Sequence, residues 1–321
     1  MQLTLASTNI NFPNLGITLK NVASGITIHG FTIAFYGMVI AFGMIMGYLL
    51  SERLCKKTGL DPELALDFVI WGVLMGVVGA RAYYCIFNWD AFSDNPVSVL
   101  NLRTGGLAIY GGIIGGVLAA VVFCRIRKVY IPAFMDIGLP GICIGQIIGR
   151  WGNFFNREAF GTYTDGLFAM RIDVTEVNRY FNPATPLSEI QNAYQNQPQL
   201  LKNILEIREH AVTIDGATYI QVQPTFLYES LLNLCLLLII LLYVKHRKFR
   251  GELALIYFMG YGLIRFWIEK YRTDPLLMGN TAIPVSRLLS AVLFTVSLVI
   301  FIIGHIRVRK NRKEPEPVPE N

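Results

Sequence analysis

Long apolar runs, separated by polar stretches, recur along almost the whole chain. Each run approaches the roughly 20 residues that a helix needs to cross a bilayer. The pattern therefore predicts an all-α polytopic membrane protein with about seven transmembrane helices. The expected spans lie near residues 31–51, 67–89, 105–124, 131–149, 225–244, 252–270 and 284–304.

Lysine and arginine follow every second span. Basic clusters come after the first, third, fifth and seventh runs, whereas the connection between the second and third runs opens with the acidic stretch 90–96. Positive charge gathers on the cytoplasmic side of membrane proteins. The regular alternation of basic and non-basic connections predicts an outer N-terminus and a cytoplasmic C-terminus. It also supports the count of seven spans. The clusters are Arg53, Lys56 and Lys57; Arg125, Arg127 and Lys128; Lys245, Arg247, Lys248 and Arg250; and Arg307, Arg309, Lys310, Arg312 and Lys313.

Two segments outside the spans are expected on the outer side of the membrane. Residues 1–30 are mildly polar and β-prone and lack the pattern of a cleaved signal peptide. Residues 162–222 predict a small α+β domain, inserted between helices 4 and 5 on the outer side. This insert could cover a site, receive a polypeptide or be passive. Within it we expect strands at 168–173 and 218–223, a hairpin at 212–220 around Asp215-Gly216, and a helix at 187–209 capped by Ser188.

The predicted organisation has five parts along the chain. The last of them ends in alternating proline and glutamate, a composition typical of disorder. The parts are an outer N-terminal segment (1–30), transmembrane helices 1–4 (31–150), an outer-face motif with the soluble insert (151–223), transmembrane helices 5–7 (224–305), and a basic, then disordered, cytoplasmic tail (306–321).

Composition agrees with a membrane protein. Of the 321 residues, 53% are hydrophobic and only 16% are charged, whereas a soluble domain carries about a quarter charged residues. The net charge of +6 comes from the basic clusters beside the spans, so it requires no nucleic-acid partner. The five cysteines and four histidines are dispersed, and this predicts no disulfide, no metal site and no cofactor.

The densest group of hydrogen-bonding side chains is the stretch 149–161, GRWGNFFNREAFG, directly after the fourth apolar run. Arg150 and Asn153 are three residues apart, so they share a face if the helix continues through them. A guanidinium can hold a phosphate or a carboxylate at two points. We interpret the stretch as a candidate anion site. The alternative is an arginine that reaches lipid headgroups beside asparagines that cap the helix.

The sixth apolar run carries a second group of this kind. Arg265 and Glu269 are four residues apart and Tyr261 lies one turn earlier, so the three share one helical stripe. A charge near the bilayer centre costs about 2.5–3.5 kcal/mol, so each needs a reason. We interpret Arg265 as functional because its stripe reaches the same outer level as Arg150. The alternative is an internal ion pair that ties helices together.

Other polar groups in the runs are less decisive. Arg81 and Asp136 could be functional or could pair helices, and the sequence leaves both open. Glu229 stands near the start of the fifth run. The glycine-rich stretch 105–116 favours close helix packing. It also contains the phenol of Tyr110.

Together these residues resemble the prolipoprotein diacylglyceryl transferase family of bacteria. The stretch 149–161 matches the family's defining motif at every fixed position, and the second motif around Arg265 makes coincidence improbable. The likeness covers most of the chain except the termini and the insert at 162–222. The other matching stretches are Phe35-Tyr36-Gly37, Gly79-Ala80-Arg81, residues 105–116, Asp136, Pro224 to Glu229, and Tyr261 through Arg265 to Glu269.

The resemblance implies a transferase that needs no cofactor. Members transfer the sn-1,2-diacylglyceryl group of phosphatidylglycerol to the thiol of a lipobox cysteine. The products are a thioether-linked preprolipoprotein and glycerol phosphate. The resemblance also implies a site toward the outer leaflet of the bacterial cytoplasmic membrane. Its expected partners are phosphatidylglycerol, the signal peptides of preprolipoproteins and membrane lipid.

Site residues carry over from the family residue by residue. In this view Arg150 and Arg265 hold the lipid phosphate, and the two acidic residues shape the site around them. The implied catalytic residues are Arg150, Arg265, Tyr110, Glu158 and Glu269. The implied phosphatidylglycerol-binding residues are Arg150, Asn153, Tyr36, Tyr261, Arg265 and Gly161.

Two positions depart from the family pattern. Tyr110 and Gln223 stand where many members have histidine. A phenol ordinarily keeps its proton at neutral pH, so we expect Tyr110 to orient substrate and not to act as the base. The base would then be Glu158 or Glu269, or the thiol would ionise in the field of the arginines.

Two other function classes stay open at this point. A transporter for an anionic solute could use Arg81, Arg150 and Arg265 as binding cations, although transporters usually show internal repeats and no convincing repeat relates the two halves here. A lipid-binding relative without activity is the second alternative, because Tyr110 replaces histidine. An assay for the thioether product separates these classes.

Overall fold

The computed structural model describes residues 8–29, 31–102, 105–273 and 284–311. The disordered tail that we predict at 314–321 lies outside the described residues. The chain divides into two compact units. The first comprises Met1–Met46, Ile142–Phe249 and Leu255–Asn321, and the second comprises Gly47–Gly141 and Arg250–Ala254.

Helices dominate the described chain, and six of them are long and apolar enough to cross a membrane. Large exposed apolar side chains such as Phe42, Trp71 and Leu242 lie along them, as lipid contact requires. The protein is therefore a polytopic membrane protein. A further apolar helix, α8 (Glu252–Ile268), has 17 residues, the short end of the range for a span. The six are α1 (Phe35–Thr58), α2 (Glu63–Phe87), α3 (Ile109–Ile126), α4 (Ile131–Asn156), α7 (Thr225–Tyr243) and α9 (Val285–Asn311).

In the second unit, α2 and α3 pack through glycine. A methyl group at Gly79 would come within 2.9 Å of the Gly115 Cα atom, and one at Gly111 would come within 3.0 Å of the Ala80 Cα atom. Neither position has room for a side chain. The glycine-rich stretch thus allows the backbones of two apolar helices to meet, which maximises their van der Waals contact.

Arg81 and Asp136, which the sequence left open, both satisfy backbone groups of the second unit. Asp136 is fully buried, and it accepts hydrogen bonds from the N–H groups of Gly251 (2.7 Å) and Ala254 (3.0 Å) at the start of α8. Arg81 is also buried. These contacts give both charges a role in the fold. Arg81 donates to the carbonyl oxygens of Ser98, Val99, Asn101, Gly105 and Gly106 at 2.7–3.0 Å.

The first unit contains an antiparallel five-stranded sheet in the order β2-β1-β5-β7-β6. Its first two strands come from the N-terminal segment and the other three from the insert, joined where Asn11 faces Arg171. Ile10, Ile172 and Ile220 of the sheet form one apolar core with helix α6 (Pro198–Glu209). The strands are β1 (Thr8–Phe12), β2 (Ile17–Val22), β5 (Met170–Asp173), β6 (Val212–Ile214) and β7 (Ala217–Val222), and a separate hairpin pairs β3 (Gly25–Ile28) with β4 (Phe31–Ala34).

The hairpin that we predict at 212–220 is confirmed. β6 and β7 are joined by Asp215 and Gly216 with φ values of 51° and 81°, the left-handed backbone that a two-residue hairpin turn requires. The strands predicted at 168–173 and 218–223 are confirmed as β5 and β7, each within two residues.

The single helix that we predict at 187–209 is wrong in its detail. Two helices form, α5 (Leu187–Ala193) and α6 (Pro198–Glu209). Pro198 occupies the first turn of α6, where its missing N–H costs nothing, whereas inside a longer helix it would break a hydrogen bond. The predicted Ser188 cap is also wrong, because Pro186 stands at the N-cap of α5 and no side chain caps it.

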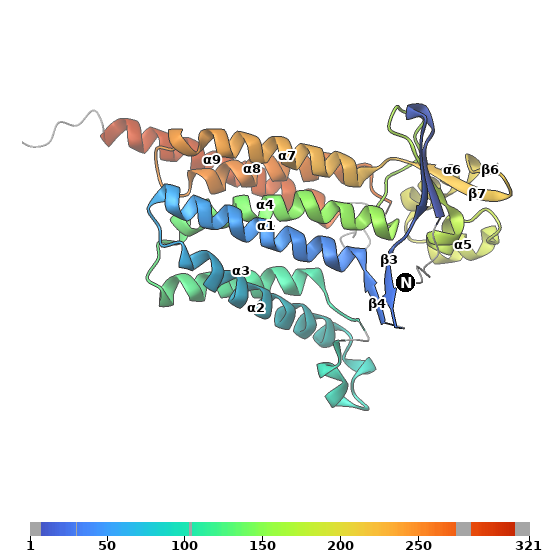
Figure 1. Cartoon of the computed structure of the whole chain (residues 1–321), viewed down its shortest axis with the longest axis horizontal. Helices are drawn as coiled ribbons and strands as arrows, with labels where there is room; N and C mark the ends of the chain where they lie inside the picture. The colour runs from blue at the N-terminus through green and yellow to red at the C-terminus, as the bar shows by residue number, and fades with distance from the viewer. Residues whose placement is uncertain (1–7, 30, 103–104, 274–283, 312–321) are drawn as a thin grey trace, which may run out of the picture. The chain divides into compact units, whose positions relative to one another are not determined.

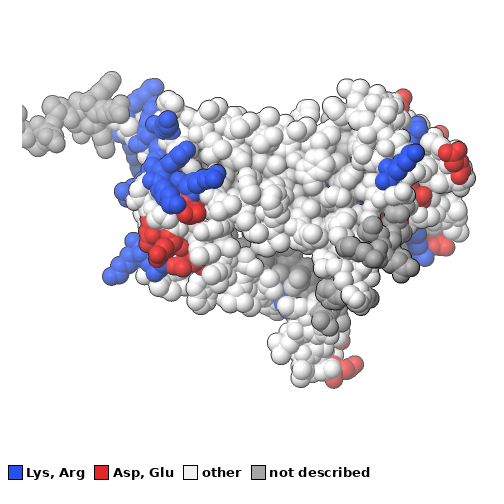
Figure 2. Space-filling view, in the orientation of Figure 1, with Lys and Arg blue, Asp and Glu red and all other residues white. Residues whose placement is uncertain are grey.

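Basic residues mark one end of the helices in the first unit. α7 and α9 both finish away from the five-stranded sheet (Figure 1). Lys245 follows α7 in the short 3-10 helix η7 (Val244–His246), and Arg309 and Lys310 lie in the last turn of α9. Figure 2 shows Lys and Arg side chains gathered at that end, with uncharged side chains along the helices. The remaining 3-10 helices are η1 (Pro13–Leu15), η2 (Trp89–Ala91), η3 (Pro96–Leu100), η5 (Val174–Glu176) and η6 (Arg179–Phe181).

Candidate active site

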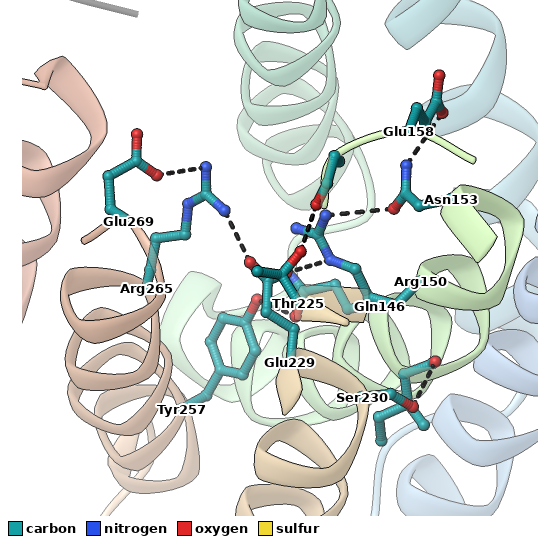
Figure 3. A network of polar contacts seen from close by, with 12 residues as sticks. Gln146, Arg150, Asn153, Glu158, Thr225, Glu229, Ser230, Tyr257, Arg265 and Glu269 are labelled. Atoms are coloured by element: carbon teal, nitrogen blue, oxygen red, sulfur yellow. Dashed lines mark hydrogen bonds and ion pairs between the residues drawn. The ribbon is translucent and has the colours of Figure 1, made fainter. Parts of the chain in front are cut away.

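The motif at 149–161 begins inside a helix. α4 continues to Asn156, beyond the end near residue 149 that the apolar pattern predicts. Arg150 and Asn153 therefore do share a face, and Arg150 Nη1 donates to Asn153 Oδ1 at 3.3 Å. This contact fixes the guanidinium of Arg150 on the side of α4 that meets α7 and α8 (Figure 3).

Glu229 of α7 joins the two arginines predicted from sequence. Its Oε2 atom pairs with Arg150 Nε of α4, and its Oε1 atom accepts from Arg265 Nη1 of α8 at 2.8 Å. Arg265 Nη2 pairs in turn with Glu269 Oε2 at 2.8 Å. Figure 3 shows the four side chains as one chain of alternating charge between the three helices.

The carboxylates of this chain are deeper than the arginines. The side chains of Glu229 and Glu269 are only 3% and 1% exposed, whereas those of Arg150 and Arg265 are 22% and 16% exposed. Buried charges need partners of opposite sign, and the two acidic groups supply them. The two arginines are therefore the more exposed members of this group of four charges.

α4 is tied to both neighbouring helices. Ser230 Oγ of α7 donates to the Ile147 carbonyl oxygen at 3.0 Å. Tyr257 Oη of α8 donates to Gln146 Oε1 at 3.1 Å. These bonds lie within one turn of Arg150, so they hold the helices that carry the three central charges in register (Figure 3).

The segment that follows α4 holds Glu158 against Asn153. Asn153 Nδ2 donates to Glu158 Oε1 at 3.0 Å, and Asn156 Nδ2 donates to the same oxygen at 3.4 Å. Glu158 is exposed. Through Asn153 it is linked to Arg150, so the polar network runs from Glu158 at the rim to Glu269 (Figure 3).

The backbone after α4 makes two unusual turns. Arg157 and Ala159 have φ values of 51° and 54°, a left-handed conformation that costs a non-glycine residue about 1–2 kcal/mol. Contacts at both positions offset this cost. Thr225 Oγ1, in the first turn of α7, donates to the Ala159 carbonyl oxygen. The turns aim Glu158 back toward Asn153.

Arg157 anchors the motif to the sheet. Its guanidinium is buried and donates to the carbonyl oxygens of Phe155 and of Val22, the last residue of β2. Glu176 lies 3.8 Å away. Burial lowers the pKa of the Arg157 guanidinium, and the nearby Glu176 carboxylate opposes that effect.

Gly161, the last residue of the motif, lies close to residues 223, 225 and 272. Gly161 donates its N–H to the Gln223 carbonyl oxygen at 2.9 Å and bridges to Arg272. A side chain at 161 would come within 2.9 Å of Gln223 Cβ and 3.0 Å of Thr225 Cγ2. These contacts give Gly161 a packing role, and its predicted role in lipid binding stays a prediction.

Two tyrosines predicted to line the site, Tyr36 of α1 and Tyr261 of α8, contact residues of these helices. A methyl group at Gly152 would come within 2.7 Å of the Tyr36 ring, so that ring packs directly on the motif. Tyr261 stacks on Tyr257 with ring centroids 5.6 Å apart. Tyr110 is the second residue of α3 and belongs to the other unit. Within the described residues, no group of three or more His, Cys, Asp or Glu could hold a metal ion.

The region that contains this network is shared with known proteins. The family described as prolipoprotein diacylglyceryl transferase matches residues 24–303. The chain belongs to this family. It is 37% identical over 289 residues to the phosphatidylglycerol–prolipoprotein diacylglyceryl transferase of Finegoldia magna, covering 90% of this chain and 95% of the relative. Proteins with the same name from Lactobacillus johnsonii and Shouchella clausii are each 36% identical, covering 85% and 87% of this chain and 86% and 89% of the relatives.

Most residues that the family resemblance singles out come together in one network. The network links two motifs that lie more than a hundred residues apart in the sequence, through the single carboxylate of Glu229. The predicted residues that belong to it are Arg150, Asn153, Glu158, Arg265 and Glu269.

Sequence reasoning missed the role of Glu229. It marked this residue as a charge near the start of an apolar run and as the end of the family-matching stretch 224–229, but it assigned the residue no partner and no part in the site. The available clue was the count of charges, because two arginines at one membrane level need more than Glu269 to balance them. The structure selects Glu229 over Glu158 as that partner because the Glu229 carboxylate of α7 reaches both Arg150 of α4 and Arg265 of α8.

Proposed function

We propose that this protein transfers the sn-1,2-diacylglyceryl group of phosphatidylglycerol to the thiol of the lipobox cysteine in preprolipoproteins. The reaction forms a thioether and releases glycerol phosphate, and it is the first step of bacterial lipoprotein maturation. Family membership and the printed names of the relatives support this function. The observation that carries it is the pair of arginines, Arg150 and Arg265, joined through one carboxylate group.

The chemistry requires an anion to leave. The thiol sulfur attacks the glycerol carbon that bears the phosphate, a C–S bond forms, and the C–O bond breaks with its electron pair moving onto the phosphate oxygen. Negative charge therefore grows on the phosphate in the transition state. Arg150 and Arg265 are placed to stabilise it, and preorganised donors of this kind are often the largest single contribution to catalysis.

Acidic groups support the arginines in this mechanism. Asn153, held by Glu158, orients Arg150, and Glu269 orients Arg265. An ordinary thiol, with a pKa of about 8.5, is a poor nucleophile when neutral, and nearby cations favour its thiolate. The proton then passes to a carboxylate such as Glu158 or Glu269, or to water. Tyr110, Tyr36 and Tyr261 would position the substrate through hydrogen bonds and ring contacts.

The proposed membrane placement puts the site toward the outer leaflet of the bacterial cytoplasmic membrane. α8 would be a seventh span, with the N-terminus outside and the C-terminus in the cytoplasm. The basic residues at the ends of α7 and α9 support this orientation. The sheet with its helices would then lie outside, where a preprolipoprotein emerges with its signal peptide still in the membrane.

The direct test is an assay with purified protein, labelled phosphatidylglycerol and a peptide that contains a lipobox cysteine. We expect a thioether product that a cysteine-to-serine peptide does not yield. Arg265→Ala should abolish product while the protein stays folded and membrane-inserted, as judged by its thermal transition in detergent. A folded Arg265→Ala protein with wild-type turnover would remove the arginine pair from the mechanism.

A further inference from the structure

The two arginines of the proposed phosphate site already share an anion. Glu229 is buried, and its two oxygens divide between them, Oε1 to Arg265 at 2.8 Å and Oε2 to Arg150. A carboxylate therefore occupies the place between the guanidinium groups. A phosphate offers the same arrangement of two oxygens to the same donors.

The four charges that pair directly at the centre of the network balance without a substrate. Arg150 and Arg265 contribute two positive charges, and Glu229 and Glu269 contribute two negative charges. The phosphate of phosphatidylglycerol adds one more negative charge. It would bind the same guanidinium nitrogens of Arg150 and Arg265 that already contact Glu229. Two anions that bind the same guanidinium groups would lie close together, and like charges repel strongly where little water screens them. Substrate phosphate and Glu229 therefore compete for the arginines.

Glu269 differs from Glu229 in this respect. It pairs with Arg265 through Nη2, whereas Glu229 uses Nη1. It also follows Arg265 by one helical turn, so it can support that arginine from its own helix. Displacing Glu269 would free one arginine only, while displacing Glu229 frees both.

We propose that Glu229 is a placeholder for the phosphate. It fills the position between Arg150 and Arg265 in the empty enzyme and gives up these contacts when the lipid phosphate enters. This inference rests on the proposed function and assigns a role that neither the sequence motif nor the comparisons provide. It also explains how product leaves, because glycerol phosphate carries more charge than the lipid and Glu229 competes to reclaim the arginines.

The rival role for Glu229 is purely organisational. In that case it would hold the arginines in position while phosphate binds their outer edges. The two roles predict opposite effects of removing the charge. Without a placeholder, an anion binds more tightly. Without an organiser, the arginines lose their position and an anion binds more weakly.

Glu229→Gln separates the two roles because it keeps the shape and removes the charge. The probe is sn-glycerol 1-phosphate, measured as an inhibitor of thioether formation and, independently, by the shift it causes in the thermal transition. We expect it to bind roughly tenfold more tightly to the variant, as when one charge-assisted hydrogen bond stops competing. Unchanged or weaker binding would overturn the placeholder role.

Steady-state kinetics provide a second measurement. If product is held more tightly, Glu229→Gln should lower the KM for phosphatidylglycerol and also lower kcat, with a first turnover faster than the following ones. A structural defect would raise KM and show no such burst. A raised KM without a burst therefore counts against the proposal.

Two further variants serve as a control and as an independent test of the placeholder role. Glu206→Gln, on the exposed side of α6, makes the same chemical change away from the site and should leave the affinity for glycerol phosphate unchanged. Glu229→Asp keeps the charge but is one methylene shorter, so it should reach at most one arginine and give an intermediate affinity. If Glu229→Gln does not fold, Glu229→Asp decides, because affinity equal to or below that of wild type overturns the proposal.

The outcome is distinguishable from failure of the proposed function. A wild-type protein that forms thioether, together with a Glu229→Gln variant that binds glycerol phosphate no more tightly, removes the placeholder role and leaves the function intact. A wild-type protein that forms no thioether removes the function and the placeholder role with it.

Discussion

Arg150 owes its orientation to groups on two helices. Asn153 contacts one nitrogen of its guanidinium and Glu229 another. A planar group with donors in a fixed fork keeps its direction when two of them are held. The guanidinium therefore already faces the position between the two arginines that the lipid phosphate would take over from Glu229.

We expect Arg150→Lys to lose about 100-fold in kcat/KM although the charge is kept. An ammonium group cannot keep the contact with Asn153 and also bind a phosphate at two points as a planar guanidinium can, and loss of one preorganised donor costs about this much. The measurement is thioether formation at several lipid concentrations. Arg179→Lys, on the exposed surface of the sheet domain, is the matched control. Full activity in Arg150→Lys would reduce Arg150 to a membrane-surface anchor.

Tyr110→Phe should keep measurable activity. A phenol holds its proton at neutral pH, so we expect its hydroxyl to orient the substrate and not to accept the thiol proton. Loss of one neutral hydrogen bond should lower kcat/KM by about tenfold or less. The measurement is a pH profile of thioether formation for both proteins. A variant that is inactive at neutral pH and recovers as the thiol ionises would identify Tyr110 as the base.

The element scale is clearest where α2 meets α3. Gly79, Gly111 and Gly115 leave no space for a Cβ atom, because each faces backbone of the other helix. Lipid offers no hydrophobic drive for two apolar helices to associate, so close van der Waals contact must supply the stability. A sequence of large apolar residues at these positions would keep the helices apart.

We therefore expect Gly115→Val and Gly116→Val to differ although they are neighbours. A Cβ at 115 would meet the Met75 carbonyl oxygen and Gly79 Cα, whereas a Cβ at 116 meets no described atom within 4 Å. Gly115→Val should lower the free energy of unfolding by about 1–3 kcal/mol, and Gly116→Val should lower it less. Thermal transitions in the same detergent measure this. Equal transitions for the two variants would contradict the packing of α2 on α3.

The turn after α4 shows how one element is fixed by another. Arg157 adopts a left-handed backbone conformation. Its guanidinium donates hydrogen bonds to two carbonyl oxygens, one of them at the end of β2. The sheet therefore holds the segment that carries Glu158. The buried Arg157 side chain thus links the five-stranded sheet directly to the candidate site, a contact that the sequence does not reveal.

Arg157→Ala should destabilise the protein by about 1–3 kcal/mol, because buried carbonyl oxygens lose their donor. Thermal unfolding measures the loss. Arg179→Ala, whose side chain is largely exposed beside Glu189, should change the transition little. Burial lowers the pKa of Arg157, yet the group stays charged through the neutral range, so we expect the destabilisation to be the same at pH 6 and pH 8. A strong pH dependence would mean that another group titrates with it.

At the scale of the whole molecule, charge distribution relates the fold to the membrane. In the described parts of the chain, six helices are long and apolar enough to cross it. Those of the first unit that finish opposite the sheet do so among basic residues. Positive residues are retained on the cytoplasmic side. The proposed outer position of the sheet follows from this asymmetry.

Reporter fusions test that orientation. A reporter placed after Lys128 or Lys248 should behave as cytoplasmic, and one inserted near Asn196 should behave as exported. The insertion point lies between α5 and α6, in the connection that precedes Pro198, so it should disturb neither helix. An exported reporter at Lys248, or a cytoplasmic one near Asn196, would reverse the orientation and with it the outer-leaflet site.

The sequence by itself determined the properties that depend on neighbouring residues. Apolar runs of sufficient length make a polytopic membrane protein, helical spacing places Arg150 with Asn153 and Arg265 with Glu269, and Asp215-Gly216 makes a hairpin. The motif at 149–161 also identifies the family. Each of these properties can be recognised within one continuous stretch of the sequence, from its hydrophobic pattern, its helical spacing, its turn residues or its motif.

Only the tertiary structure decided which distant groups meet. Glu229 and Arg265 are 36 residues apart, and their pairing depends on how α7 packs beside α8. Arg81 bonds to carbonyl oxygens up to 25 residues away, and β1 joins β5 across the membrane helices between them in sequence. A buried charge accepts any partner of the right polarity, so the sequence shows that one is needed, and the packing of the helices decides which residue it is.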